Sequence, residues 1–209
     1  MVGFVLGDGV VLASANPKKA AEIREILGDA IVLVPRPTAV PEVVEDADTF
    51  EGNARLKAIA LAEATGLVAL ADDSGLEVDA LDGAPGVRSA RYAGVDASAA
   101  DNVGALLAAL DELDRSARVG SAGPVDRSAR FRCTIVLRSP DGTELVAQGT
   151  VEGSICAAPR GGGGFGYDPV FVPAEGTGAT FAEMGATAKH AISHRGRALR
   201  SLAAHLTSS

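Results

Sequence analysis

Two adjacent carboxylates at the end of an apolar stretch are the first residues in this sequence whose type and spacing favour chemistry. Residues 67–71 read LVALA, and Asp72, Asp73, Ser74 and Gly75 follow directly. A short apolar run followed by charge favours a buried strand, where carboxylates need cations or hydrogen-bond donors to compensate their burial. Neighbouring strand residues point to opposite faces, so the two aspartates need not share a partner. Such hard oxygen ligands suit Mg²⁺; the alternative is a solvated turn of ordinary turn residues.

The segment SANPKK (14–19) has the composition of a phosphate-binding loop that opens a helix. Asn16 is a good N-cap, and Pro17 fits the first helical position. Lys18 and Lys19 stand in the first turn, where the helix dipole disfavours cations unless a phosphate is bound. A plain surface lysine pair explains the residues equally well, and the spacing is not that of a P-loop.

An acidic loop and a helix lie between these two segments. Residues 41–48 (PEVVEDAD) form the loop, and Glu45 reaches a metal if the loop folds over the carboxylates. In the helix predicted over 50–65, Asn53 and Lys57 are four residues apart and share one face. Because that face lies between alanines, a solvent-facing pair is the alternative.

Residues 161–169 (GGGGFGYDP) are rich in glycine and match the dinucleotide fingerprint G-x-G-x-x-G weakly. That fingerprint must open a helix, whereas the VFV after Pro169 predicts a strand, so we reject a Rossmann site. A glycine-rich loop that carries Phe165 and Asp168 still suits close backbone approach to a flat ligand.

Lys189, His194 and Arg195 form a cationic group near the start of the last predicted helix, which begins at about residue 193. No carboxylate is close in sequence, so a salt-bridged face does not explain the group. An anionic or oxygen-rich ligand explains it better, with a solvated surface as the alternative.

Composition narrows the possible partners. The 209 residues are 47% hydrophobic, enough for the core of one domain, whether single or two-lobed. A net charge of −8 argues against a nucleic acid polymer or an anionic membrane as partner. Cys133 and Cys156 are too far apart for a C-x-x-C motif and are expected to be buried in a reduced compartment. With no long apolar run and no basic leader pattern, we expect a cytoplasmic protein.

Periodicity and turn residues predict an alternation of strands and helices. Two strand-like runs at 131–137 and 144–155, joined by a turn at 139–142, predict a β-hairpin. Residues 114–130 are expected to form a polar loop. Further strands are predicted near 10–13, 31–34, 67–71 and 76–78, and further helices over 17–27 and 97–113.

Five separated segments resemble one family, the inosine/xanthosine triphosphate pyrophosphatases, which hydrolyse nonstandard purine nucleoside triphosphates. The segments are SANPKK (14–19), FEGNARLKA (50–58), ADDSGLEVDAL (71–81), GGFGYDPVF (163–171) and KHAISHRG (189–196). Their order matches over nearly the whole chain. The resemblance implies cleavage between the α and β phosphates, which gives a nucleoside monophosphate and pyrophosphate. We expect a single α/β domain over 1–209, with a long mixed central β-sheet flanked by helices. Two lobes, the smaller roughly 85–160, are expected to enclose a nucleotide-binding cleft, and the resemblance implies a homodimer.

The resemblance also implies roles for individual residues. Asp73 resembles the metal-binding and proton-accepting aspartate, and Glu45 falls near the second Mg²⁺ ligand. Ser14-Ala15 stands where many members have Thr-Gly, which keeps a hydroxyl and removes backbone freedom. The implied substrate-binding residues are Ser14, Ala15, Asn16, Pro17, Lys18, Lys19, Lys57, Ser74, Phe165, Gly166, Tyr167, Asp168, Lys189, His194 and Arg195.

Hydrogen-bond polarity accounts for the expected choice of base. Arg195 carries donors only, so it can satisfy the 6-keto oxygen of hypoxanthine or xanthine and cannot accept from adenine's amino group. Mispairing of such buried groups costs on the order of 10⁴-fold in rate. Phe165 can stack on the purine, and the sequence does not identify what rejects guanine.

Two alternatives remain open at this point. A related nucleotide pyrophosphatase with pyrimidine or modified-base preference fits the first segment, because S-x-x-P with a basic pair also occurs in septum-inhibitor-like enzymes. A nucleotide-binding module without turnover, in which the carboxylates are structural, is the other.

Overall fold

The computed structural model describes residues 4, 6–7, 9–14, 16–28, 31–119 and 123–207. Its strands are β1 (Val10–Leu12), β2 (Leu33–Val34), β3 (Val68–Val78), β4 (Ser128–Arg138), β5 (Glu144–Ile155) and β6 (Phe171–Pro173). Its α-helices are α1 (Pro17–Leu27), α2 (Phe50–Thr65), α3 (Ala99–Val119), α4 (Ala186–Ile192) and α5 (His194–Thr207), with two short 3-10 helices, η2 (Asp79–Leu81) and η3 (Gly86–Arg91).

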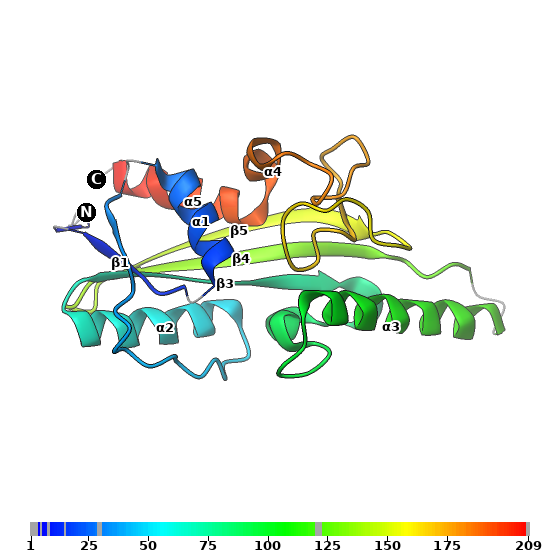
Figure 1. Ribbon diagram of the computed structural model, residues 1–209, viewed down its shortest axis with the longest axis horizontal. Coiled ribbons are helices and arrows are strands. Elements are labelled where there is room, and N and C mark those ends of the chain that lie inside the picture. Colours follow the sequence, from blue (N-terminus) through cyan, green and yellow to red (C-terminus); the bar gives the residue numbers. More distant parts are fainter. Residues whose placement is uncertain are drawn as a thin grey trace. The chain divides into compact units, whose positions relative to one another are not determined.

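The strands form one mixed sheet in the order β2-β1-β3-β4-β5-β6. β1 runs parallel to both β2 and β3, and β5 is antiparallel to β6. β3, β4 and β5 are the long strands (Figure 1). The predicted fold class, a mixed central sheet flanked by helices, is confirmed.

The chain divides into two compact units, each assembled from separated pieces of sequence. Unit 1 comprises residues 1–74, 133–150 and 193–209. Unit 2 comprises residues 75–132 and 151–192. The turn of the β4–β5 hairpin therefore belongs to unit 1.

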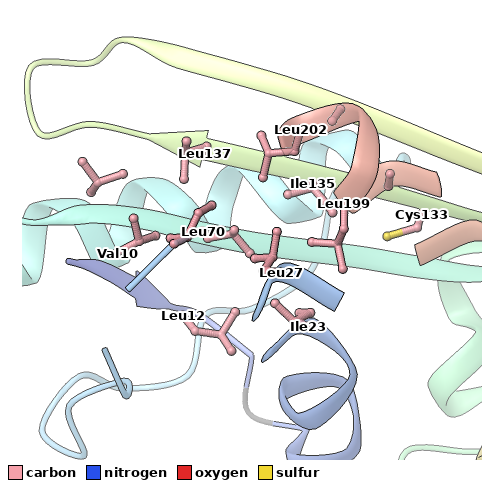
Figure 2. Close-up of a cluster of buried hydrophobic side chains, with 14 of the residues drawn as sticks. Val10, Leu12, Ile23, Leu27, Leu70, Cys133, Ile135, Leu137, Leu199 and Leu202 are labelled. Carbon is pink, nitrogen blue, oxygen red and sulfur yellow. The ribbon is translucent and has the colours of Figure 1, made fainter. Parts of the chain in front are cut away.

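In unit 1, helices cover both faces of the sheet, and alternate strand residues supply the two cores. Val68 and Leu70 of β3 pack with α1, α5 and β4 in the larger cluster (Figure 2). Ala69 and Ala71, one residue out of phase, pack against the alanine-rich side of α2. Figure 1 shows α1 and α5 on one face of this part of the sheet and α2 on the other. The side-chain period of two in a strand thus sets which helix each β3 residue meets.

In unit 2, one core joins the far end of β3 to α3 and to an aromatic group. Leu76 and Val78 belong to this cluster, together with apolar side chains of α3. The rings of Phe131 and Phe171 meet edge to face with centroids 4.7 Å apart, a favoured aromatic geometry.

The predicted helix starts are confirmed by their caps. The Asn16 side chain accepts from the backbone N–H groups of Lys18 at 3.0 Å and Lys19 at 3.2 Å. Thr49 Oγ1 accepts from Gly52 N at 3.0 Å, and Gly66, in the left-handed conformation, caps the C-terminal end of α2. These local signals identify helix ends well because they satisfy otherwise unpaired backbone groups.

Two predicted segments are wrong in extent. β3 does not end at Asp72 but continues through the Asp-Asp-Ser-Gly sequence to Val78, so these residues are not a solvated turn. The predicted loop over 114–130 is also shortened, because α3 extends to Val119 and β4 begins at Ser128. Within the described part of the chain, no helix has the length and apolarity needed to cross a membrane.

Candidate active site

Asp72 and Asp73 lie in the middle of β3 and point to opposite faces of the sheet in unit 1. Asp72 continues the register of Val68 and Leu70, on the side of α1 and α5, and Asp73 continues that of Ala69 and Ala71, on the side of α2. Both are buried, with 3% and 6% of their surface exposed. The two aspartates contact different side chains, which agrees with the expectation that they need not share one partner.

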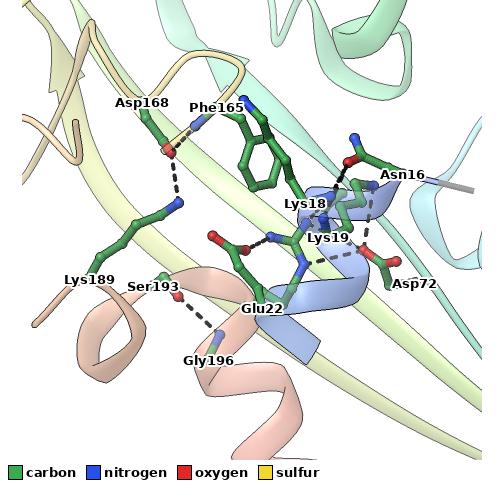
Figure 3. A network of polar contacts seen from close by, with 12 residues as sticks. Asn16, Lys18, Lys19, Glu22, Asp72, Phe165, Asp168, Lys189, Ser193 and Gly196 are labelled. Atoms are coloured by element: carbon green, nitrogen blue, oxygen red, sulfur yellow. Dashed lines mark hydrogen bonds and ion pairs between the residues drawn. The ribbon is translucent and has the colours of Figure 1, made fainter. Parts of the chain in front are cut away.

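Asp72 is surrounded by cations. Its Oδ2 lies 3.4 Å from Lys19 Nζ and 3.4 Å from both Nε and Nη2 of Arg195. Figure 3 shows Lys19, in the first turn of α1, directed at Asp72. Among the described residues, the other carboxylate oxygen, Oδ1, is buried and has no hydrogen-bond partner. Two cations thus share a single oxygen, at distances longer than those of tight charge-assisted bonds.

Arg195 is 2% exposed and is held by groups far from it in sequence. Its Nη1 donates to Glu22 Oε2 at 2.5 Å, and its Nη2 donates to Ser74 Oγ at 2.9 Å. The expectation that this arginine lacks nearby carboxylates is wrong, because α1 and β3 bring Glu22 and Asp72 to it. Sequence proximity could not reveal contacts that cross more than 120 positions.

These contacts keep the Asp72 carboxyl group and the Arg195 guanidinium ionised. Burial by itself raises the pKa of Asp72, but the positive charges of Lys19 and Arg195 outweigh it and hold the pKa well below its usual range. Burial by itself lowers the pKa of Arg195, but Asp72 and Glu22, with a contribution from Cys133, together outweigh it, so the pKa is raised. A buried ion cluster of this kind is stable only while its partners stay together.

Asp73 has a different neighbourhood, built by α2 and the acidic loop. Lys57 Nζ lies 3.5 Å from Asp73 Oδ1 and 3.2 Å from Glu45 Oε1. Asn53 Nδ2 donates to Asp73 Oδ2 at 3.3 Å. The alternative of a solvent-facing Asn53–Lys57 pair is wrong, because both side chains turn toward the sheet and Asn53 is fully buried.

The surroundings of Asp73, unlike those of Asp72, favour the protonated form of its carboxyl group. Burial raises the pKa of Asp73, the charge of Lys57 opposes this only in part, and the Glu45 and Asp72 carboxylates add to the rise. Burial lowers the pKa of Lys57, but its carboxylate neighbours outweigh this and the pKa is raised. Two adjacent carboxylates whose environments push their pKa values apart are the usual arrangement for divided acid–base roles.

Asp73 and Glu45 are the candidate ligands for a metal in unit 1. No group of three or more His, Cys, Asp or Glu side chains in the described ranges is arranged to hold a metal by itself. Asp73 and Glu45 nevertheless converge on one position, since both contact the same ammonium group. Mg²⁺ typically uses one or two carboxylates and completes its shell with water and phosphate. The donor set therefore fits a Mg²⁺ ion that arrives with a phosphate ligand.

The start of α1 supplies backbone donors and lysines in unit 1. Ser14 Oγ donates to Asn16 O at 3.3 Å, and the Asn16 cap holds the first turn in place. Lys18 is exposed, whereas Lys19 turns inward to Asp72. A helix N-terminus with two lysines is suited to anions. Ala15, predicted to bind substrate, lies outside the described residues.

The predicted base-binding residues of unit 2 form a second group. Asp168 Oδ2 accepts from Lys189 Nζ at 2.7 Å and from Phe165 N at 2.8 Å. Lys189 Nζ also lies 5.0 Å from the centre of the Phe165 ring (Figure 3). Lys189 was expected to lack a carboxylate partner, and that expectation is wrong. A Cβ on Gly164 would lie 2.0 Å from Asp168 Oδ2, so the glycine-rich loop closes on its own aspartate.

Gly166, Tyr167 and His194 complete the predicted set. Gly166 has a positive φ of 61°, and the Tyr167 hydroxyl donates to Ser89 O at 3.0 Å. Burial raises the pKa of Tyr167, which suits a structural hydroxyl. His194 opens α5 and is buried in unit 1. Sequence reasoning identified Asp72 as a candidate buried carboxylate without giving it a role in the site, and it missed Glu22, which no local signal distinguishes from a solvated acid.

Known proteins with similar sequences and structures place the chain in a family. A model of the Ham1 family matches residues 10–205. A dITP/XTP pyrophosphatase of Geobacter sulfurreducens is 48% identical over 200 residues, which cover 94% of this chain and 96% of the relative. The Streptomyces coelicolor protein of the same name is 46% identical over 198 residues, 92% of this chain and 94% of the relative. The structure of a HAM1 protein from Coxiella burnetii superposes with a TM-score of 0.84 at 44% identity, covering 96% of this chain and 98% of that one. The predicted family resemblance is confirmed, and the chain belongs to the Ham1 family.

Proposed function

We infer that this protein is a nucleoside triphosphate pyrophosphatase that hydrolyses nonstandard purine nucleotides such as ITP, dITP and XTP. The products are the nucleoside monophosphate and pyrophosphate. The names of the relatives, dITP/XTP pyrophosphatase, support this substrate class at identities near 50% over most of the chain. Removal of such nucleotides cleans the nucleotide pool.

The convergence of two carboxylates on one lysine is the observation that best supports this chemistry for the chain. Glu45 from the acidic loop and Asp73 from β3 meet at Lys57 Nζ within 3.2 and 3.5 Å. Phosphoanhydride hydrolysis needs charge neutralisation at the phosphates together with carboxylates that hold a metal and a water. This part of unit 1 provides both charges in one place.

In this proposal, different residues bind the metal, bind the phosphates and orient the water. Asp73 and Glu45 would hold Mg²⁺, which when bound neutralises phosphate charge. Lys57, beside both carboxylates, binds phosphate oxygens, and Lys18, Lys19 and the α1 N-terminus bind the rest of the triphosphate. Asp73, whose raised pKa makes it a better proton acceptor than an ordinary aspartate, orients the attacking water.

Selection of the base is assigned to groups that carry donors only. Lys189 and Arg195 can donate to a 6-keto oxygen but cannot accept from the 6-amino group of adenine. Phe165, held at its backbone N–H by Asp168, offers a ring for stacking. The preference for ITP over ATP follows from this polarity.

Pyrophosphate release from ITP, dITP, XTP, UTP, dTTP and ATP, with and without Mg²⁺, tests the proposal. We expect Mg²⁺-dependent release from the first three, with kcat/KM at least about 10³-fold above that for ATP. Turnover of UTP or dTTP above that of ITP would instead favour the pyrimidine-preferring enzyme. Binding of ITP without release would leave only a nucleotide-binding module.

The homodimer implied by the family resemblance belongs to the same proposal. Light scattering of the purified protein should give twice the chain mass of 21.0 kDa. A mass of one chain at micromolar concentration would remove the dimer from the proposal.

A further inference from the structure

Asn53 is a fully buried polar side chain in the first turn of α2. Its Oδ1 accepts from the backbone N–H of Ala47 at 3.0 Å, and its Nδ2 donates to Asp73 Oδ2 at 3.3 Å. A buried amide of this kind is retained at a cost unless its hydrogen bonds are made. Asn53 therefore connects the acidic loop to β3.

The direction of the amide follows from chemistry. Because the group of Ala47 that faces the amide is its backbone N–H, a donor, the amide atom next to it must be the oxygen, and the nitrogen must face Asp73. An N–H donor at this position favours Asp73 as an acceptor with a fixed side-chain orientation. A carboxylate of fixed orientation is what a metal ligand requires.

The same turn holds the loop that carries Glu45. A Cβ on Gly52 would lie 2.7 Å from Ala47 Cβ and 3.0 Å from Thr49 Oγ1, so the loop packs where only glycine leaves room. The N–H of Asn53 also donates to Thr49 O at 3.0 Å. One turn later, Lys57 contacts both Glu45 and Asp73. Asp73 and Glu45 thus meet at Lys57 from two different segments, β3 and the acidic loop, which the side chain of Asn53 connects.

We propose that Asn53 is a positioning residue that sets Asp73 and the Glu45 loop at the separation a divalent cation needs. The inference rests on the proposed function, because it concerns the metal and triphosphate of that reaction. In this proposal Asn53 acts through Asp73 and the Glu45 loop, without itself binding the metal or the triphosphate. Loss of a group that orients a metal ligand typically weakens metal binding by roughly 10–100-fold.

Asn102 provides a matched control in unit 2. It is also buried, with 5% exposed, and lies near the start of a helix, α3. Its Oδ1 accepts from Ala93 N at 2.8 Å, and its Nδ2 donates to Ala90 O at 3.1 Å. Both asparagines therefore tie a helix to the segment that precedes it, and of the two only Asn53 has a carboxylate as its second partner.

The experiment measures binding of α,β-methylene-ITP, an analogue that cannot be cleaved at this bond, by calorimetry in Mg²⁺ and in EDTA. We expect Mg²⁺ to tighten binding to the unmodified protein. In EDTA, Asn53→Ala should bind the analogue as the unmodified protein does. In Mg²⁺, the gain in affinity should be smaller than that of the unmodified protein by about tenfold or more. Asn102→Ala should lower the unfolding midpoint to a similar degree and keep the full gain.

A second variant keeps the proposal testable if Asn53→Ala does not fold. Gly52→Ala displaces the loop without removing the amide and should also reduce the Mg²⁺-dependent gain. An undiminished gain in Asn53→Ala or in Gly52→Ala, an equal loss in Asn102→Ala, or no effect of Mg²⁺ on the unmodified protein would overturn the positioning role. Failure of the unmodified protein to bind the analogue at all would instead overturn the proposed function.

Discussion

The two faces of β3 at Asp72 and Asp73 differ in charge although the residues are adjacent in sequence. On the Asp72 face, Lys19 and Arg195 surround one carboxylate and lower its pKa. On the Asp73 face, Lys57 is shared with Glu45, and the pKa of Asp73 is raised. The difference arises from the helices that cover each face, since both aspartates are buried to a similar degree.

One strand can therefore supply both a carboxylate that stabilises the fold and a carboxylate that is suited to catalysis. A carboxylate that stays ionised under all ordinary conditions is a counter-ion for a buried arginine. A carboxylate whose charged form is disfavoured is available to a proton or a metal. The two roles need different surroundings, and the period-two alternation of the strand provides them.

The largest expected effect comes from Asp73→Asn. The substitution keeps the shape of the side chain and removes its charge, so we expect kcat for ITP to fall by roughly 10³-fold. The free energy of unfolding should not fall, because a buried charge is removed. Turnover within about tenfold of the unmodified protein would take Asp73 out of the mechanism.

Asp72→Asn should show the converse pattern. Removal of one partner of a buried ion cluster costs about 3 kcal/mol of unfolding free energy, measurable by urea denaturation. As a control, Glu152→Gln breaks an exposed pair with Arg130 and should cost less than about 1 kcal/mol. Equal losses for the two variants would show that the Asp72 cluster contributes no more than a surface pair.

The pH dependence of stability should have opposite signs for the two aspartates. Because the pKa of Asp72 is lowered in the folded protein, its contribution is complete above the unfolded value of about 3.9 and is lost as the pH falls below it. Because the pKa of Asp73 is raised, its contribution is present at low pH and is lost as the pH rises through the folded value. A pKa difference of one between folded and unfolded protein corresponds to about 1.4 kcal/mol.

Urea denaturation of the two Asn variants and the unmodified protein between pH 3 and pH 8, without metal, measures this. The stability gap between the unmodified protein and Asp72→Asn should widen as the pH rises from 3 to 5. The gap to Asp73→Asn should move in the opposite direction. Parallel curves for the two variants would contradict the division.

The smallest expected effect concerns Ser74, which follows Asp73 and whose Oγ accepts a hydrogen bond from Arg195 Nη2. Ser74→Ala should cost about 1 kcal/mol in unfolding free energy. It should be non-additive with Asp72→Asn, because both residues contact Arg195, and additive with Asp73→Asn. Additivity with both would place Ser74 outside the arginine cluster.

Much of the fold could be predicted because its signals are local. The Asn16 and Thr49 caps and the glycine after α2 mark helix ends through bonds that span only a few residues. The sequence predicts two short strands, 67–71 and 76–78, in place of the single strand β3, because Asp-Asp-Ser-Gly has the composition of a turn. Burial between covering helices overrides that preference, as tertiary packing often does.

The candidate site was only partly predictable for a related reason. Lys19, Lys57 and Asp73 were identified from motifs, and the structure places them around the middle of β3. Asn53, a partner of Asp73, and Glu22, a partner of Arg195, were not assigned to the site. The contact between Glu22 and Arg195 crosses 173 positions and leaves no periodic signal. The assignment of roles to the predicted residues stays a prediction.

Carbon-13 NMR of the aspartate carboxyl groups, followed over pH in protein without metal, tests the division between Asp72 and Asp73 most directly. The Asn variants assign the two signals. We expect the Asp72 signal to remain that of a carboxylate down to the lowest pH at which the protein is folded, and the Asp73 signal to titrate above the ordinary aspartate value of about 3.9. Titration of both carboxyl groups at the same, ordinary pH would contradict the account.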